Sequence, residues 1–498
     1  MPAAPGGAEP SVPEANWGGV SLTAIETVER RAKQLSVFAI PLICAAQLMA
    51  TLDVTIVNLA LPAMQRELGL SNAGLAWMID AYTLAYAGLL LVGGRAGDLI
   101  GRRRTLMIGI FLFTAASLVA GLAADPGVLL AARAAQGVGA ALATPTTLSL
   151  ITTLFPAGPA RTRAMVAYGA MAGLGITLGL VLGGVLTEAA SWRWVFLVNV
   201  PIGVLLLAAA PRVLPESTGT RSRVDVLGAA TGTAGLTSLV YGVIRAGSDG
   251  WRDPVSALAV VLAVLLLIAF VVIELRVAEP MLPLRLLRHR ARLGAYLIAA
   301  LLFACLYPSF FFLSRALQDV LDQGPIEAGL RFLPLGVGVL LFAILTRRLM
   351  QTTGPRPLVL VGTAATAIAA LALILLDVDT SYPALLLPCI VGLGAGVGVT
   401  FVANAAAAMT DVSEPDAGIA SGLLSTFQAV GGTIGVAALA AVAARVSESD
   451  LARATQGRPA TPQLVDGALM AGFGQAFAIA GGLAVLAFLI ATLTSPRR

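Results

Sequence analysis

Long apolar stretches alternate with short, arginine-rich polar segments along almost the whole chain. Each stretch holds about 20 residues, the length at which a helix crosses the hydrocarbon core of a bilayer. The pattern therefore predicts an all-α polytopic membrane protein with 14 transmembrane helices. The predicted spans are 36–60, 73–93, 105–124, 127–151, 164–188, 194–211, 226–244, 256–274, 293–313, 327–346, 358–376, 383–409, 417–443 and 470–493.

The span at 226–244 is the weakest of these because it is rich in Gly and Thr, and its loss would invert every later span. The distribution of Lys and Arg residues tests whether 226–244 is a span. With 14 spans and both termini cytoplasmic, 22 of the 32 Lys and Arg residues fall in cytoplasmic segments, 8 in outer loops and 2 within spans. This excess fits the positive-inside rule. The net charge of +5 thus reflects orientation in the membrane, and no nucleic-acid partner is expected.

Composition excludes several classes of function. Only 12% of residues are charged and 58% are hydrophobic, which excludes a soluble enzyme. The three cysteines all lie in apolar stretches, so neither a disulfide framework nor a CxxC motif is present. The one lysine, Lys33, does not belong to a phosphate-binding loop. We expect no enzymatic activity, no cofactor and no metal site.

An internal repeat divides the chain. GLSNAGL at 69–75 aligns with GPIEAGL at 324–330, and Gly101 aligns with Gly354 at nearly the same offset. Two six-helix bundles separated by two inserted helices would explain this repeat, although chance similarity between apolar segments is the alternative. The predicted domains are a cytoplasmic tail at 1–34, an N-terminal bundle at 35–211, inserted helices with flanking cytoplasmic loops at 212–292, a C-terminal bundle at 293–494 and a cytoplasmic C-terminus at 495–498.

The tail contains a short periodic pattern of apolar residues. Leu22, Ile25 and Val28 recur every three residues. They predict either a short interfacial helix or an extension of the first span.

Three charged residues lie within the spans at a similar depth from the outer surface: Asp53, Asp80 and Arg133. An ionised carboxylate in hydrocarbon is costly, so each is a functional candidate. Burial favours a neutral carboxyl and a nearby guanidinium favours an ionised one, so an Asp beside an Arg can bind and release a proton as its exposure changes. A static ion pair that holds the helices together is the alternative for both aspartates.

Glycines form a stripe on the fifth predicted span. Gly175, Gly179 and Gly183 recur at a spacing of four, and Gly184 adjoins the last of them. Such a stripe allows another helix to approach closely. Tight packing without any role in transport is the alternative.

A second glycine-rich segment, GRAGDLIGRRR, connects the second and third spans. Its carboxylate, Asp98, lies between Gly94 and Gly101, and Arg102 follows. Anchoring at the cytoplasmic surface explains the arginines but not the acidic residue. A carboxylate presented to a helix N-terminus or to an arginine would form a conformational latch.

Taken together, these segments resemble the major facilitator superfamily and, within it, the fourteen-span drug:proton antiporter family. The similar motifs are LDVTIVNLALP in span 1, GRAGDLIGRRR in the loop, RAAQGVGAAL in span 4 and GLGITLGLVLGGVL in span 5. The resemblance implies proton coupling or cationic-drug recognition at Asp53, proton transfer at Arg133 and gating by the loop. The chain departs from the family pattern at Ala96, Leu99 and Leu180, the last of which replaces a proline.

The resulting functional hypothesis is a proton-coupled antiporter of a bacterial cytoplasmic membrane. It would export lipophilic, cationic or antibiotic-like small molecules by alternating access, as a monomer. Its partners would be this substrate, protons and the lipid bilayer. A proton-coupled importer and a membrane sensor or scaffold without transport are the alternatives.

Aromatic residues of the spans are candidates for the substrate cavity, although ordinary packing would explain them equally well. These candidates are Tyr82, Tyr86, Tyr307, Phe310 and Phe427.

Overall fold

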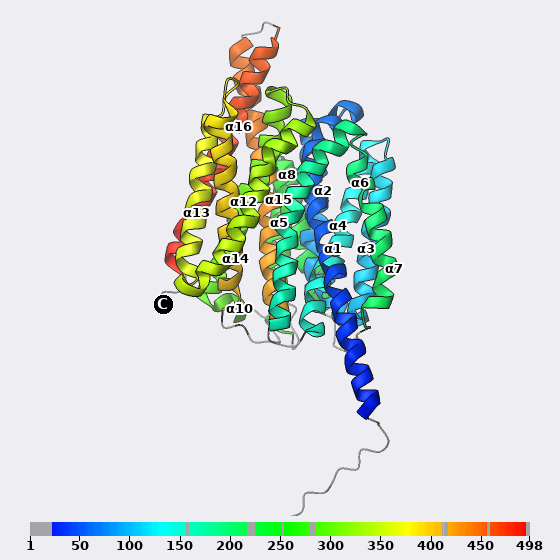
Figure 1. Cartoon of the computed structure of the whole chain (residues 1–498). Helices are drawn as coiled ribbons and strands as arrows, with labels where there is room; N and C mark the ends of the chain where they lie inside the picture. Colours follow the sequence, from blue (N-terminus) through cyan, green and yellow to red (C-terminus); the bar gives the residue numbers. More distant parts are fainter. Residues whose placement is uncertain are drawn as a thin grey trace, which may run out of the picture.

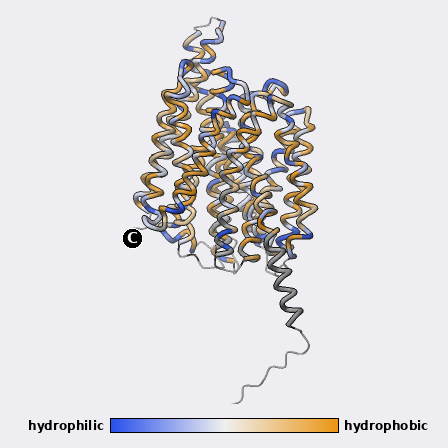
Figure 2. Tube along the Cα trace, in the orientation of Figure 1, coloured by the Kyte–Doolittle hydropathy of each residue, from blue (hydrophilic) through white to orange (hydrophobic). Residues whose placement is uncertain are grey.

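Helices run roughly side by side through nearly the whole length of the molecule in the computed structural model (Figure 1). The structure describes residues 22–155, 159–216, 225–250, 253–277, 285–410, 412, 417–455 and 459–494. Within these ranges every regular element is a helix. Hydrophobic residues dominate the helices, and hydrophilic residues gather toward the two ends (Figure 2). This distribution is the one expected of a protein that spans a bilayer.

The helices of the N-terminal part are α1 (Leu22–Leu68), α2 (Asn72–Ile100), α3 (Arg102–Leu122), α4 (Pro126–Leu154), α5 (Pro159–Ala189), α6 (Trp194–Leu197) and α7 (Asn199–Val213). The middle of the chain forms α8 (Val226–Asp249), α9 (Pro254–Glu274) and the short α10 (Arg285–Arg288). The C-terminal part forms α11 (Arg290–Arg315), η1 (Ala316–Val320), α12 (Pro325–Thr353), α13 (Pro355–Ala372), η2 (Leu373–Leu375), η3 (Tyr382–Leu386), α14 (Leu387–Ala408), α15 (Ala417–Thr455) and α16 (Pro462–Thr494).

Among the described residues, 12 helical segments are long and apolar enough to cross a membrane. They include 227–246 on α8, so the weakest predicted span is a candidate membrane helix. The two predicted spans outside this set are α2 and α5, helices of 29 and 31 residues. The count of 14 spans therefore stays a prediction for these two helices.

The helices assemble as two bundles with an inserted pair. Helices α1 to α7 pack mainly on one another, and so do α11 to α16. Helices α8 and α9 form a pair, and α8 packs on α2 and α15. The two bundles meet where α5 packs on α12 and where α2 packs on α15. The predicted fold, two six-helix bundles plus two inserted helices, is confirmed, while the exact domain boundaries stay predictions.

An ion pair between Arg245 and Asp253 connects the two inserted helices. Asp253 caps the start of α9 by accepting a hydrogen bond from the Ser256 backbone N–H, and the Arg245 guanidinium donates another at 2.8 Å. These contacts, chiefly that with Arg245, lower the pKa of Asp253 to about 2. The carboxylate therefore remains ionised across the physiological range and fixes the entry to α9.

The two ends of the molecule differ in how the bundles meet. We call the end with the α1–α2 turn the Gly69 end and the end with the α2–α3 turn the Gly101 end. One apolar core at the Gly69 end joins both bundles, with Leu59 of α1 and Phe312 of α11 among its members. Nearer the Gly101 end, the apolar cores stay within one bundle or within the other and α9. The bundles are thus closed on each other at the Gly69 end.

Several helices are longer than their apolar stretches predicted. Helix α1 begins at Leu22. The segment with Leu22, Ile25 and Val28 is therefore an extension of the first span and not a separate interfacial helix. Helices α15 and α16 continue beyond the other helices at the Gly69 end, at the top of Figure 1. Hydropathy marks only the part of a helix that lies in lipid.

The internal repeat has a structural counterpart. Gly101 (φ 100°) joins α2 to α3, and the aligned Gly354 (φ 76°) joins α12 to α13. Both lie in the left-handed region that a residue with a side chain rarely adopts. The two bundles therefore turn at matching glycines.

Candidate functional site

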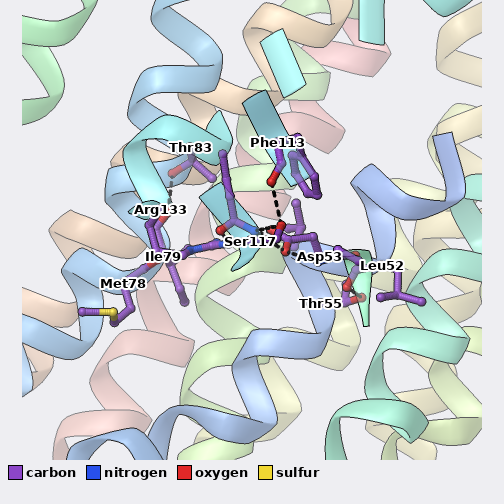
Figure 3. A network of polar contacts seen from close by, with 12 residues as sticks. Leu52, Asp53, Thr55, Met78, Ile79, Thr83, Phe113, Ser117 and Arg133 are labelled. Carbon is purple, nitrogen blue, oxygen red and sulfur yellow. Dashed lines mark hydrogen bonds and ion pairs between the residues drawn. The ribbon is translucent and has the colours of Figure 1, made fainter. Parts of the chain in front are cut away.

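An ion pair between Asp53 of α1 and Arg133 of α4 lies at the centre of the N-terminal bundle. The Arg133 Nη1 donates to Asp53 Oδ2 at 2.6 Å. The two side chains are 0% and 1% exposed. Figure 3 shows Asp53 and Arg133 inside a network of polar contacts. The sequence placed the two residues at one depth, and the structure brings them into direct contact.

Two amide side chains complete the coordination of the carboxylate. Gln136 Nε2 and Asn199 Nδ2 both donate to Asp53 Oδ1, at 3.0 and 2.9 Å. Gln136 also donates to the Ser117 hydroxyl at 2.8 Å. Three donors from α4 and α7 therefore satisfy Asp53, as a buried carboxylate requires.

These polar partners of Asp53 were not predicted from the sequence. Gln136 follows Arg133 by three residues and so lies on the same face of α4, a spacing that is visible in the sequence. Asn199 is a lone amide in the apolar segment WRWVFLVNVPIG, which is also a visible signal. Ser117 resembles any other small residue of a membrane helix, and nothing in the sequence distinguishes it.

Arg133 is held on its other side by α2. Its Nε donates to the Met78 carbonyl at 2.9 Å, and its guanidinium carbon lies 4.6 Å from the centre of the Tyr82 ring. Tyr82 in turn stacks on Tyr86, with ring centres 6.0 Å apart. The guanidinium is thus fixed between a carboxylate, a carbonyl and an aromatic face, so its position depends on α1, α2 and α4 together.

Asp80 differs from Asp53 in its surroundings. It lies on α2, it is 0% exposed, and neither of its carboxyl oxygens has a hydrogen-bond partner in the described structure. The Arg133 guanidinium, which could have paired with it, instead bonds the Met78 carbonyl and Asp53. A static ion pair with Arg133 is therefore absent at Asp80.

The glycine stripe of α5 packs on the helix that carries Asp53. A Cβ added at Gly175 would lie 2.7 Å from Cβ of Thr51, and one added at Gly179 would lie 2.0 Å from Oγ1 of Thr55. A Cβ at Gly183 would lie 2.6 Å from the carbonyl oxygen of Ile56. The stripe thus allows α5 to contact the backbone of α1 on both sides of Asp53 along the helix.

Gly184 faces the other bundle. A Cβ there would lie 2.3 Å from the Pro325 carbonyl oxygen of α12. Nearby, Glu188 accepts a hydrogen bond from the Ile326 backbone N–H at 2.9 Å. The Ser314 hydroxyl of α11 also donates to the Asn58 carbonyl of α1 at 3.1 Å. The four predicted glycines therefore serve two contacts, one within a bundle and one between bundles.

The loop segment lies at the Gly101 end. The Gly101 carbonyl accepts hydrogen bonds from the Thr105 backbone N–H and hydroxyl. A Cβ added at Gly94 would lie 3.8 Å from Cβ of Pro145 on α4. The Arg102 Nη1 donates to the Ser149 carbonyl at 3.3 Å. The side chain of Asp98 lies outside the described residues. The gating role of these residues stays a prediction.

The predicted cavity aromatics lie in packed surroundings. Tyr307 packs edge to face on Phe303, Phe310 on Phe332, and Phe427 stacks on Tyr296. None of the five candidates lines the cavity between α11, α15 and α16 or the small cavity between α11 and α14. Their role in substrate binding stays a prediction.

Comparisons with known proteins place the chain in a family. The model of the Major Facilitator Superfamily matches residues 43–436. The chain belongs to the Major Facilitator Superfamily. It is a membrane transporter of that superfamily and not an enzyme, as the sequence predicted.

Two relatives are similar over most of their length. The puromycin resistance protein of Streptomyces alboniger is 42% identical, covering 90% of this chain and 89% of its own. The cephamycin export protein of Amycolatopsis lactamdurans is 38% identical, covering 92% and 91%. Among solved structures, a bacterial homologue of the human lysosomal transporter Spinster has a TM-score of 0.67 at 17% identity, covering 93% of this chain and 97% of that one.

Proposed function

We propose that this transporter is a proton-coupled antiporter that exports lipophilic, antibiotic-like small molecules across a bacterial cytoplasmic membrane. The observation that carries the proposal is the Asp53–Arg133 ion pair, fully buried and linked to four helices. Charged side chains inside a membrane bundle are energetically costly, and those that are present usually mark a functional site. The names of the two relatives, a puromycin resistance protein and a cephamycin export protein, support the outward direction and the substrate class.

The proposed orientation places the Gly101 end in the cytoplasm. Helix α1 begins and α16 ends at this end (Figure 1). The arginine-rich segments around Arg102 and Arg288 also lie there. Positive charges favour the cytoplasmic side. The structure, closed at the Gly69 end, then corresponds to a cytoplasm-facing state of a monomer with both termini inside.

The proton step follows from the bonds of Asp53. In the cytoplasm-facing state, the carboxylate accepts bonds from Arg133, Gln136 and Asn199, which stabilise its ionised form. Release of a proton to the cytoplasm is therefore favoured in this state. When the opposite end opens, α1 moves relative to α4 and α7, these bonds weaken, and Asp53 takes up a proton from outside. The proton gradient thereby drives the return to the cytoplasm-facing state.

Asp80 has a different part in this scheme. A buried carboxyl without a partner is far less costly in its neutral form. Asp80 would therefore carry a proton in the cytoplasm-facing state and change its charge only when the bundles rearrange. It would be a second proton-binding group, whereas Asp53 is the primary one.

The glycine contacts couple this chemistry to the conformational change. Gly179 holds α5 against α1 beside Asp53, and Gly184 holds the same helix against α12 of the other bundle. Movement of α12 relative to the N-terminal bundle is thus transmitted through α5 to α1. Loss of the contact at Gly184 would accompany opening of the Gly69 end.

The test is proton release from everted membrane vesicles. Respiration acidifies the lumen, a pH-sensitive dye reports the gradient, and puromycin or a lipophilic cation is added. We expect the added substrate to collapse the gradient in wild type. The Asp53→Asn variant should still bind the substrate, measured on purified protein, and should show no collapse. The matched control is Asp253→Asn, at an acidic residue outside the spans, which should behave as wild type.

Two outcomes would contradict the proposal. Uphill export by Asp53→Asn would remove Asp53 from proton coupling. Export of an added compound by wild type without any collapse of the respiration-driven gradient would show that proton movement is not coupled to export.

A further inference from the structure

A cavity of about 270 Å³ lies at the Gly69 end, where the bundles are closed. Helices α11, α15 and α16 form most of it, and Trp77 of α2 and Ile244 of α8 complete the wall. It shares no residue with the network around Asp53. Its volume approaches the lower limit for sites that bind small organic molecules.

The wall of the cavity is mainly apolar and includes four aromatic side chains. Phe311 and Phe312 of α11 and Phe473 of α16 line it together with Trp77. The facing surface of α15 consists mainly of alanines, and Phe311, Phe312 and Phe473 pack on one another opposite it, each only 2% exposed. Such a surface favours a flat, apolar ring system.

One cation is positioned within this apolar wall. Arg315, at the end of α11, lines the cavity and its side chain is only 9% exposed. Its Nε donates to Asp319 at 2.7 Å, and its guanidinium carbon lies 5.7 Å from the centre of the Phe473 ring. Among the described residues, its two terminal nitrogens have no hydrogen-bond partner. A nearly buried guanidinium therefore retains donors for a ligand.

The backbone at this arginine is also irregular. The π-helical turn η1 (Ala316–Val320) follows Arg315 directly and places Asp319 to hold its Nε. Turns of this type cost helical regularity and often occur where a helix positions a side chain for binding. The turn fixes the guanidinium with its terminal nitrogens unengaged.

We propose that this cavity is a second ligand site, separate from the Asp53 centre, that binds an aromatic monocarboxylate. The ring would lie between the wall formed by Phe311, Phe312 and Phe473 and the alanines of α15, and the carboxylate would accept two hydrogen bonds from the terminal nitrogens of Arg315. A guanidinium suits this two-point contact with a carboxylate better than an ammonium group does. Glu448 also lies on the cavity lining, but it is exposed, so solvent screens its repulsion of the ligand's carboxylate.

The experiment measures protection of a cysteine in the cavity. Ser447 lines the cavity and accepts a nearly isosteric replacement, Ser447→Cys, while the native Cys44, Cys305 and Cys389 are buried. Purified full-length protein reacts with N-ethylmaleimide in the presence of 2-naphthoate. At twice the dissociation constant the reaction should slow about threefold, because the unliganded fraction is 1/(1 + [L]/Kd). The neutral 2-naphthylmethanol should protect far less.

Four variants establish specificity. Ser381→Cys, at an exposed residue of the same end outside the cavity, should show no protection. In the Ser447→Cys background, Arg315→Gln should abolish protection and Arg315→Lys should restore part of it. Because Arg315→Gln also removes the partner of Asp319, Ala440→Phe provides a second test by filling the apolar part of the cavity while leaving Arg315 in place.

The proposal fails if 2-naphthoate gives no saturable protection, if the neutral alcohol protects equally, or if protection survives in Arg315→Gln or Ala440→Phe. Asp53→Asn in the Ser447→Cys background should retain full protection. The assay reads binding directly, so its result is independent of whether the proton-coupling proposal holds.

Discussion

Asp53 and Asp80 are two buried carboxyl groups on neighbouring helices of one bundle, and their surroundings are opposite. Both are 0% exposed. Asp53 accepts hydrogen bonds from Arg133, Gln136 and Asn199, whereas no partner reaches either oxygen of Asp80 in the part of the chain that the structure describes. Residue type and depth are therefore insufficient to define the function of a membrane carboxyl, and its donors decide which charge state the fold stabilises.

The two carboxyl groups differ in how far their surroundings compensate the desolvation of the ionised form. An ionised Asp53 is stabilised by a cation and two amides, so its desolvation penalty is partly offset. An ionised Asp80 would bear that penalty without compensation. The same bundle thus surrounds one carboxyl group with donors and leaves the other without any, and the proposed proton coupling depends on this difference.

The largest effect is expected for Arg133→Gln. Removal of the cation leaves Asp53 buried without its counter-charge and also removes the bond to the Met78 carbonyl. Breaking a buried pair from one side costs about 3 to 5 kcal/mol. We expect a strongly lowered thermal transition of the purified protein, followed by intrinsic fluorescence, and no substrate-driven proton movement in everted vesicles.

The double variant Asp53→Asn with Arg133→Gln serves as the control for this result. Its two neutral side chains remove the unpaired charge, so part of the lost stability should return while transport stays absent. If Arg133→Gln is as stable as wild type, then Asp53 is already neutral in this state and the contrast with Asp80 is wrong.

A smaller effect is expected for Asn199→Ala, which removes one of the three donors to Asp53. The loss of a buried hydrogen bond to a charged group costs about 1 to 3 kcal/mol. Because the ionised form loses more than the neutral form, the proton should be held more tightly. The pH at which transport is half-maximal should therefore rise in vesicles assayed over a pH series.

Asn404→Ala is the matched control for that shift. Asn404 is also a buried amide, but it donates to the Ala295 carbonyl in the other bundle at 2.8 Å. It should lower stability by a comparable amount without moving the pH profile. Equal shifts in the two variants would mean that the profile reports stability and not the ionisation of Asp53.

The sequence predicts the fold well because hydropathy and loop charge report directly on the bilayer. The apolar stretches located every long helix of the described residues, including the Gly- and Thr-rich α8. The pattern failed at helix ends such as Thr455, because the polar extension of α15 beyond the lipid has no apolar signature. It also missed the break between α6 and α7, which falls inside a continuous apolar run.

The site was only partly predictable for a related reason. Charge at a common depth identified Asp53, Asp80 and Arg133, since any ion in a membrane helix is conspicuous. Which carboxylate pairs with Arg133 depends on helix rotation, which the sequence does not give for helices that are apolar on most faces. Neutral partners such as Ser117 are not conspicuous at all. The Asp53–Arg133 contact therefore required the structure.

The smallest effect on stability is expected for Asp80→Asn, and this variant tests the comparison most directly. Asparagine has nearly the shape of a protonated aspartate, and no hydrogen bond to the Asp80 side chain is lost. The free energy of unfolding should change by less than about 1 kcal/mol, well below the cost of a broken buried pair. Measured beside it, Asp53→Asn should be clearly destabilised, because Arg133 then loses its counter-charge.

An Asp80→Asn protein much more stable than wild type would show that Asp80 is ionised and strained in the native state. One destabilised as strongly as Asp53→Asn would mean that Asp80 has a partner of its own. In either case the two carboxyl groups would not be the opposites described here, and proton binding at Asp80 would need another physical basis.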